Sequence, residues 1–126
     1  MKLDRIEDNE MLYRVVRKSY PDSFIDGKPT AALFIDGKGV SVDRDGGRAE
    51  AQIVESFMNR FAKSDDYGHA VKIQTGICRK IGTFPTPVGN KKNKYHAEIH
   101  ESENEIQISF IKALRLANEC QIVSPL

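Results

Sequence analysis

The sequence predicts an α+β fold, with a mainly antiparallel sheet and two amphipathic helices packed against it. Short segments rich in β-branched and aromatic residues predict strands, and the brief connections between them favour hairpins. Two longer segments, 48–63 and 104–119, repeat apolar residues at helical spacing. Because strands and helices mix along the chain, the α+β class is favoured. The 126 residues predict a single domain over 1–126, large enough for a core without metal or disulfide support.

The first third of the chain contains the segments that we expect to begin the sheet. Residues 1–10 are polar and are expected to form a flexible arm. Residues 11–17 are rich in β-formers and predict the first strand. After a loop over 21–30, residues 31–35 and 40–43 predict an antiparallel pair joined by an Asp-Gly-Lys-Gly turn.

The middle of the chain begins with the clearest helical pattern, over 48–63. Its apolar residues recur every three or four positions: Ile53, Val54, Phe57, Met58 and Phe61. Residues 69–74 predict another strand. Residues 75–81 are either its continuation or one short helix capped by Thr75.

The last third is expected to begin with a loop over 82–94, because it contains two prolines and two glycines. Residues 95–100 predict a strand, and residues 121–123 predict a last strand that closes the sheet. The helix predicted over 104–119 places one set of residues on a single stripe: Ile106, Phe110, Ala113, Leu114 and Ala117.

Composition and charge exclude some classes of function. The formal net charge is +1, so the whole molecule has no electrostatic preference for nucleic acid or for a membrane. No apolar run approaches the roughly 18 residues of a membrane-spanning helix, and the N-terminus lacks the apolar stretch of a secretory signal. We therefore expect a cytoplasmic protein without a membrane partner, in which Cys78 and Cys120 remain reduced.

The strand 95–100 carries the most distinctive pattern. Tyr95, Ala97 and Ile99 point to one face, while His96, Glu98 and His100 form a polar stripe on the other. Two imidazoles and a carboxylate at alternate positions suggest a metal site, since zinc accepts nitrogen and oxygen ligands. No further ligand has a recognisable spacing, and the candidates are His69, Asp43 and Cys120. The alternative is that these polar residues form the solvent face of an amphipathic strand.

Charge changes sign around this strand. Residues 72–94 contain six basic residues and no acid, whereas residues 98–105 contain four acids and no lysine or arginine. Lys91, Lys92 and Lys94 could contact phosphates, with Tyr95 and Phe84 stacking on bases, so nucleic acid is one candidate partner. A solvated turn of lysines is the simpler interpretation, because no nucleic-acid-binding motif is present.

A second set of residues suggests an enzyme. An arginine on the first strand (Arg14), a serine on a mid-chain strand (Ser41) and a later glutamate (Glu98) resemble the arrangement in ADP-ribosyltransferases. The resemblance implies that Arg14 and Ser41 would bind NAD or another nucleotide, and that Glu98 would be the catalytic carboxylate that stabilises a cationic transition state. NAD is therefore the expected cofactor for this hypothesis alone.

Scattered segments also resemble small bacterial proteins of unassigned function. These are the segments 12–14, 32–34, 40–43 and 93–99, the last of which contains an Asn-x-x-His-Ala motif. The resemblance implies a bacterial source and no activity. We therefore expect a non-catalytic binding module of a multi-component bacterial system, with another protein as its partner. Its contact surface would be the loop 82–94 and the strand 95–100, including Lys91, Lys92, Lys94, His96, Glu98 and His100.

Overall fold

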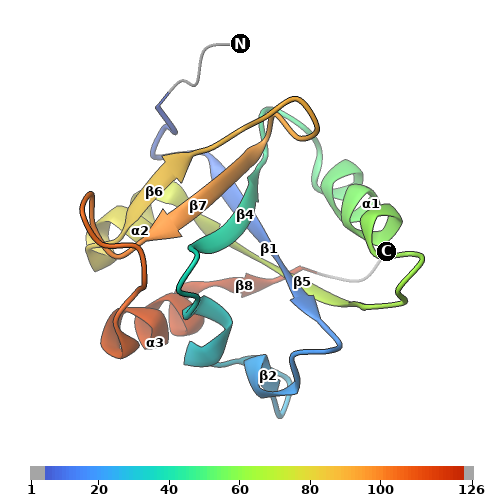
Figure 1. The fold of residues 1–126 in the computed structure, drawn as a ribbon, viewed down its shortest axis with the longest axis horizontal. Coiled ribbons are helices and arrows are strands. Elements are labelled where there is room, and N and C mark those ends of the chain that lie inside the picture. The colour runs from blue at the N-terminus through green and yellow to red at the C-terminus, as the bar shows by residue number, and fades with distance from the viewer. Residues whose placement is uncertain (1–4, 124–126) are drawn as a thin grey trace.

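The computed structural model describes residues 5–123 and confirms the α+β class. The main sheet is antiparallel throughout, with the strand order β6-β7-β4-β1-β5-β8 (Figure 1). Its strands are β1 (Met11–Arg17), β4 (Val40–Arg44), β5 (Tyr67–Gln74), β6 (Phe84–Pro87), β7 (His96–His100) and β8 (Gln121–Ile122).

The helices lie on both faces of this sheet. Helix α1 (Glu50–Arg60) packs on one face, whereas α2 (Thr75–Ile81) and α3 (Phe110–Glu119) pack on the other (Figure 1). The segment between β1 and β4 contains two 3₁₀ turns and a two-stranded hairpin: η1 (Pro21–Ser23), β2 (Phe24–Ile25), β3 (Lys28–Pro29) and η2 (Ala31–Phe34). None of the helices formed by residues 5–123 has the length and apolarity that crossing a bilayer requires.

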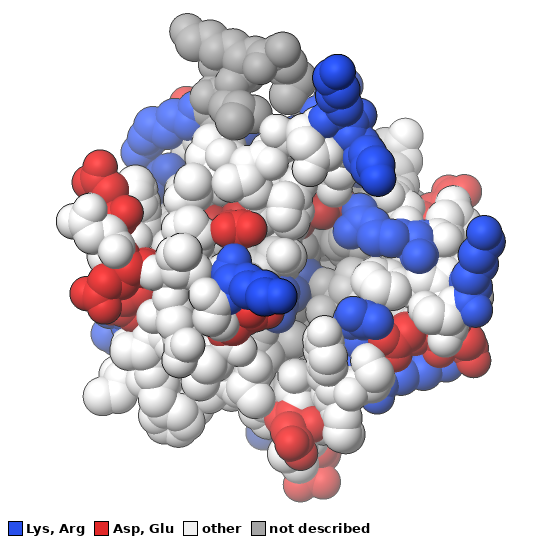
Figure 2. All heavy atoms as spheres, viewed as in Figure 1, with Lys and Arg blue, Asp and Glu red and all other residues white. Residues whose placement is uncertain are grey.

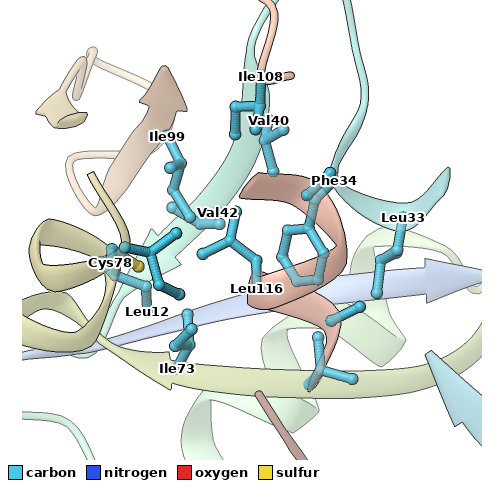
Figure 3. Packing of buried hydrophobic residues seen from close by; sticks show 14 of the residues in the cluster. Leu12, Leu33, Phe34, Val40, Val42, Ile73, Cys78, Ile99, Ile108 and Leu116 are labelled. Atoms are coloured by element: carbon cyan, nitrogen blue, oxygen red, sulfur yellow. The ribbon is translucent and has the colours of Figure 1, made fainter. Parts of the chain in front are cut away.

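The sheet separates two apolar clusters. The larger one packs Leu12, Val42 and Ile99 of the sheet against α2, α3 and η2, where Phe34 lies beside Leu116 (Figure 3). The smaller one packs α1 against β1 and β5 through Tyr13, Ile53, Val54, Phe57 and Ala70. The smaller cluster contains residues of β1 and β5 but none of β4 or β7, so polar side chains occupy the β4 and β7 part of this face.

The predicted strand over 31–35 is wrong, because Ala31–Phe34 forms the 3₁₀ turn η2. Its predicted partner, β4, pairs instead with β7 from Val40 to Asp43, and with β1 at Asp43 and Arg44. Three of the four η2 residues are buried, and η2 packs closely against α3. An apolar run without alternation therefore marks a buried turn here.

The predicted loop over 82–94 is also wrong in its first part, where Phe84–Pro87 forms β6 at the edge of the sheet. Neighbouring residues of a strand direct their N–H groups to opposite edges. Pro85 and Pro87 therefore share one edge, while Phe84 and Thr86 can donate to β7. The two prolines mark an edge strand, and only residues 88–95 connect it to β7.

Helix α3 begins at Phe110, six residues later than the sequence predicts. Residues 101–106 form a turn instead, in which Glu101 N–H donates to the Ile106 carbonyl at 3.1 Å. The predicted buried stripe is wrong in part, because Ile106, Phe110 and Leu114 are exposed. The helix buries Ala113 and Ala117, as predicted, together with Leu116, which was not part of the predicted stripe.

The remaining boundaries are close to the expected ones. Helix α1 is shorter than 48–63, residues 75–81 form a helix, and residues 121–122 form the last strand. Residues 5–10, expected to belong to a flexible arm, pack against the domain instead. Ile6 is fully buried, and Arg79 Nη2 donates to its carbonyl at 2.6 Å. Residues 1–4 lie outside the described chain.

Candidate functional site

On the α1 side of the sheet, β4 and β7 carry the polar residues that the alternation of the two strands predicts. Ser41 lies opposite Glu98 in the register, and Asp43 lies opposite His96. The intervening residues of β7, Ala97 and Ile99, are fully buried on the other face. Side chains from distant parts of the chain therefore meet on this face beside α1.

Two asparagine side chains of the loop 88–95 accept hydrogen bonds from its backbone. Asn90 Oδ1 accepts the N–H groups of Lys92 and Asn93, both at 2.9 Å. Asn93 Oδ1 accepts the Tyr95 N–H at 3.0 Å. Such Asx turns hold a short connection in one conformation, so the lysines of the loop project from a structured backbone.

A cleft of about 710 Å³ lies between this loop and α1. One group of lining residues comes from α1 and the segment before it, and the other comes from the loop. The residues are Arg48, Ser56, Asn59, Arg60, Lys91, Lys92, Asn93, Lys94 and Tyr95. None of them is acidic. Figure 2 shows lysine and arginine side chains gathered in the upper right of the view, over α1 and the loop between β6 and β7.

Asp43 ties the two walls of this cleft to the sheet. Its carboxylate accepts Arg60 Nη2 of α1 at 2.9 Å and Asn93 Nδ2 of the loop at 3.2 Å. The side chain of Asp43 is only 3% exposed, whereas that of Arg60 is 41% exposed. A buried carboxylate requires partners of this kind, so Asp43 helps to set how α1 and the loop face each other.

Arg48 and Tyr95 form a stacked pair at the cleft. The guanidinium carbon of Arg48 lies 3.6 Å from the centre of the Tyr95 ring. Arg48 also donates to the carbonyls of Arg44 and Asp45, at 2.7 and 3.1 Å, which holds its guanidinium in place. Gly46 has a φ of +57° and lies so close to the ring that an added Cβ would be 2.4 Å from it.

The positive charge of the cleft is largely uncompensated. Arg60 pairs with Asp43, but Arg48, Lys91, Lys92 and Lys94 form no ion pair with any carboxylate of residues 5–123. The sequence predicted the three lysines and missed the two arginines. The polar side of the helix pattern over 48–63 carries Arg60, but nothing in that pattern indicates which loop it faces.

The other predicted members of a nucleic-acid surface lie elsewhere. Phe84 is on β6, opposite His100 in the register, and does not line the cleft. Arg79, from the same basic segment, forms an ion pair with Asp8. Of the two aromatic residues expected to stack on bases, only Tyr95 lines the cleft.

The polar stripe of β7 forms a local cluster. His100 Nε2 lies 2.7 Å from Glu98 Oε1, and His96 Nε2 lies 3.9 Å from Glu98 Oε2. Gly39, with a φ of +101°, lies against this cluster, and a Cβ there would be 2.6 Å from Glu98 Oε1. The contacts connect the three side chains to one another.

The further ligands considered for a metal site have other neighbours. His69 packs edge-on against Phe24, and Cys120 Sγ contacts the Ala117 carbonyl. Asp43 holds Arg60 and Asn93. Within the described part of the chain, no group of three or more His, Cys, Asp or Glu side chains is arranged to hold a metal ion.

Arg14 holds together two segments that flank β1. Its Nε donates to the Leu33 carbonyl and its Nη1 to the Ser41 carbonyl, both at 2.8 Å. Strands β1 and β4 pair only at Leu12 and Tyr13, so the guanidinium lies where the two strands separate. Burial lowers the pKa of Arg14 to about 10.

Two of the three residues of the NAD hypothesis, Arg14 and Ser41, line one described cleft, and Glu98 does not line it. Arg14 and Ser41 line a smaller cleft of about 250 Å³ together with His96 and Arg60. Glu98, although opposite Ser41 in the register, is not among the described residues that line it. Two of the Arg14 nitrogens are already engaged by backbone carbonyls.

Comparison with known proteins adds no relative to this description. No protein-family model, no curated protein and no solved structure matches the chain. The function must therefore be inferred from the geometry and the electrostatics of the clefts.

Proposed function

We propose that this protein is a non-catalytic binding module that holds an anionic partner in the basic cleft between α1 and the loop 88–95. One observation carries the proposal: Arg48, Lys91, Lys92 and Lys94 line a cleft of about 710 Å³ without a paired carboxylate among the described residues. Burying such cations against an anion neutralises them without breaking an existing ion pair.

The charge distribution favours the attraction of an anion to the cleft over its attraction to the protein as a whole. The formal net charge of the chain is only +1, so distant acidic residues cancel the cleft's charge at long range. The described lining of the cleft contains five cations and no acid, and it acts on an anion over about one Debye length, roughly 8 Å at physiological salt. A partner is therefore attracted to this face in particular, and its affinity should fall as salt rises.

The contact surface that we propose lies closer to α1 than the one expected from the sequence. Lys91, Lys92 and Lys94 remain part of it, and Arg48 and Arg60 join them. The β7 stripe lies beside the cleft and would be its border. A bacterial multi-component system and a cytoplasmic location remain part of the proposal, as the sequence suggests.

The test compares two triple variants with the same loss of charge. In Lys91→Ala/Lys92→Ala/Lys94→Ala the cleft loses its loop cations. In the control Lys28→Ala/Lys38→Ala/Lys80→Ala, three exposed lysines outside the cleft are removed. Binding of two labelled polyanions, an oligonucleotide and a poly-glutamate peptide, is measured by fluorescence anisotropy.

We expect the loop variant to lose affinity for at least one polyanion, while the control binds like the unmodified protein. An equal loss in both variants would show that the attraction is non-specific and would contradict the proposal. Binding of neither polyanion by the unmodified protein at low salt would also contradict it.

A further inference from the structure

We infer that the anionic partner of the basic cleft is single-stranded nucleic acid, with its phosphates on the loop lysines and a base against the Arg48–Tyr95 pair. The inference rests on the proposed function and names the ligand of the same cleft. It depends on the placement of the charges, the stacked pair and the chemistry of the remaining lining residues.

The cations occupy both walls of the cleft. Lys91, Lys92 and Lys94 lie on the loop, while Arg48 and Arg60 lie on the helix side. Lysine is a flexible point charge that suits phosphates arriving at several positions along a backbone. A strand lying between the walls would be flanked by positive charge, as in proteins that bind single strands without sequence preference.

The stacked pair supplies a surface for a base. The guanidinium carbon of Arg48 lies 3.6 Å from the centre of the Tyr95 ring, and two backbone carbonyls hold this guanidinium. Lys94 Nζ lies 5.2 Å from the same ring centre, so a phosphate on Lys94 would be close to a base at this pair. Unpaired bases stack on tyrosine rings and on arginine guanidinium planes. Because the pair is already assembled, a base would find the surface in place and little ordering entropy would be lost.

The remaining lining residues favour nucleic acid over an acidic protein. Among the described residues that line the cleft, Tyr95 is the only aromatic or apolar one, and the others carry basic, amide or hydroxyl groups. Protein interfaces draw most of their affinity from aromatic and apolar anchors in desolvated pockets. The described lining contains one aromatic anchor and no aliphatic residue, and it offers several donors to phosphate and sugar oxygens.

The shape favours a single strand over a duplex. Proteins recognise the base pairs of a DNA duplex by inserting a helix or a β-ribbon into the major groove, which is about 12 Å wide. Here the cations line a concavity between α1 and the loop. Ser56 and Arg60, four residues apart on one face of α1, both line this concavity. A single strand can enter between two such walls.

The test measures binding of labelled dT12 and rU12 to the full-length protein by fluorescence anisotropy between about 50 and 200 mM salt. Further probes are an abasic 12-mer with the same phosphates, a 12-base-pair duplex and a poly-glutamate peptide. If the four uncompensated cations each neutralise a phosphate, the log–log salt slope is about −3, a loss of about fiftyfold over this range.

Two variants separate stacking from charge. Tyr95→Leu should weaken dT12 binding about tenfold, whereas Tyr95→Phe should bind nearly as the unmodified protein does. The abasic probe, tested on the unmodified protein, should bind about tenfold more weakly than dT12. This last measurement needs no variant, so it holds even if Tyr95→Leu does not fold. Preference for dT12 over rU12, or the reverse, identifies the kind of strand.

Several outcomes would overturn the inference. Abasic and normal strands binding equally would remove the stacking role, and a duplex binding more tightly than dT12 would remove the single-strand geometry. Poly-glutamate binding as well as or better than the oligonucleotides would leave the proposed function standing and assign the cleft to an acidic protein. Binding of no probe would contradict both.

Discussion

Removing the charge of Asp43 tests how the cleft is built. The Asp43→Asn substitution keeps the side-chain shape and can keep the hydrogen bond from Asn93, which now measures 3.2 Å. It loses the charge-assisted bond from Arg60 Nη2 at 2.9 Å. The new amide can place a donor against that nitrogen, and two donors do not bond.

The magnitude follows from the burial of the two partners. A hydrogen bond to a charged group contributes roughly 1.5–3 kcal/mol. The Asp43 side chain is 3% exposed, but Arg60 is 41% exposed and can turn toward water, which limits the loss. We expect Asp43→Asn to lower the free energy of unfolding by about 2 kcal/mol. With an m value of about 2 kcal/mol/M, the urea midpoint falls by about 1 M.

Removing the other partner should cost more. Arg60→Met leaves the Asp43 carboxylate buried with Asn93 as its remaining side-chain partner, and an uncompensated buried charge costs about 3 kcal/mol or more. The double variant should be more stable than the sum of the two losses predicts, by about 1 kcal/mol or more. Urea unfolding followed by circular dichroism measures all four proteins.

The control is the exposed ion pair between Arg5 and Glu7, whose side chains are 64% and 73% exposed. Glu7→Gln should change the urea midpoint little, because exposed pairs contribute about 0–1 kcal/mol. Additive losses in the Asp43 and Arg60 variants would show that the two side chains do not interact. That result would refute Asp43 as the connection between α1 and the sheet.

Three further predictions concern other parts of the fold. Arg14→Met should lower the free energy of unfolding by about 2–4 kcal/mol in urea titrations, because two backbone carbonyls lose their donor; an unchanged midpoint would argue against this structural role. Ile6→Ala should cost about 2–5 kcal/mol by the same assay, because the side chain is fully buried; a negligible cost would mean that residues 5–10 are not part of the core. Hydrogen bonds from Lys112 and then from the Ser109 backbone lower the pKa of Glu101 below its usual value, so its contribution to stability is present above about pH 4.5 and is lost as pH falls through the lowered pKa. Glu101→Gln should therefore narrow the stability difference between pH 7 and pH 3, and an unchanged difference would count against the ion pair.

The sequence predicted best those elements in which the spacing of polar and apolar residues decides which side is buried. In β7, Ala97 and Ile99 are fully buried while His96, Glu98 and His100 remain partly exposed, as alternation requires. The strand register follows from the same rule, because a shift by one residue would bury the charged side chains. The helical spacing over 48–63 predicted the burial of Ile53, Val54 and Phe57 on α1, but Met58 of the same stripe is exposed.

Predictions failed where a segment's neighbours, rather than its own pattern, decide its structure. Ala31–Phe34 is apolar enough for a strand but forms a 3₁₀ turn that is buried against α3. Phe110 and Leu114 have helical spacing but remain exposed, because no element of the described chain covers that side of α3. Periodicity reports that a face is apolar and does not report what lies opposite it.

The same distinction between local sequence pattern and tertiary structure applies to the basic cleft. The sequence by itself determined that β7 is amphipathic and that a lysine-rich connection precedes it. Only the tertiary structure brought Arg48 and Arg60 to that connection, by pairing β4 with β7 and by tying α1 to Asp43. The physical reason is that the local spacing of apolar residues governs which face of a segment is buried. A site formed by segments some 30–50 residues apart depends instead on the sheet register and on a buried ion pair.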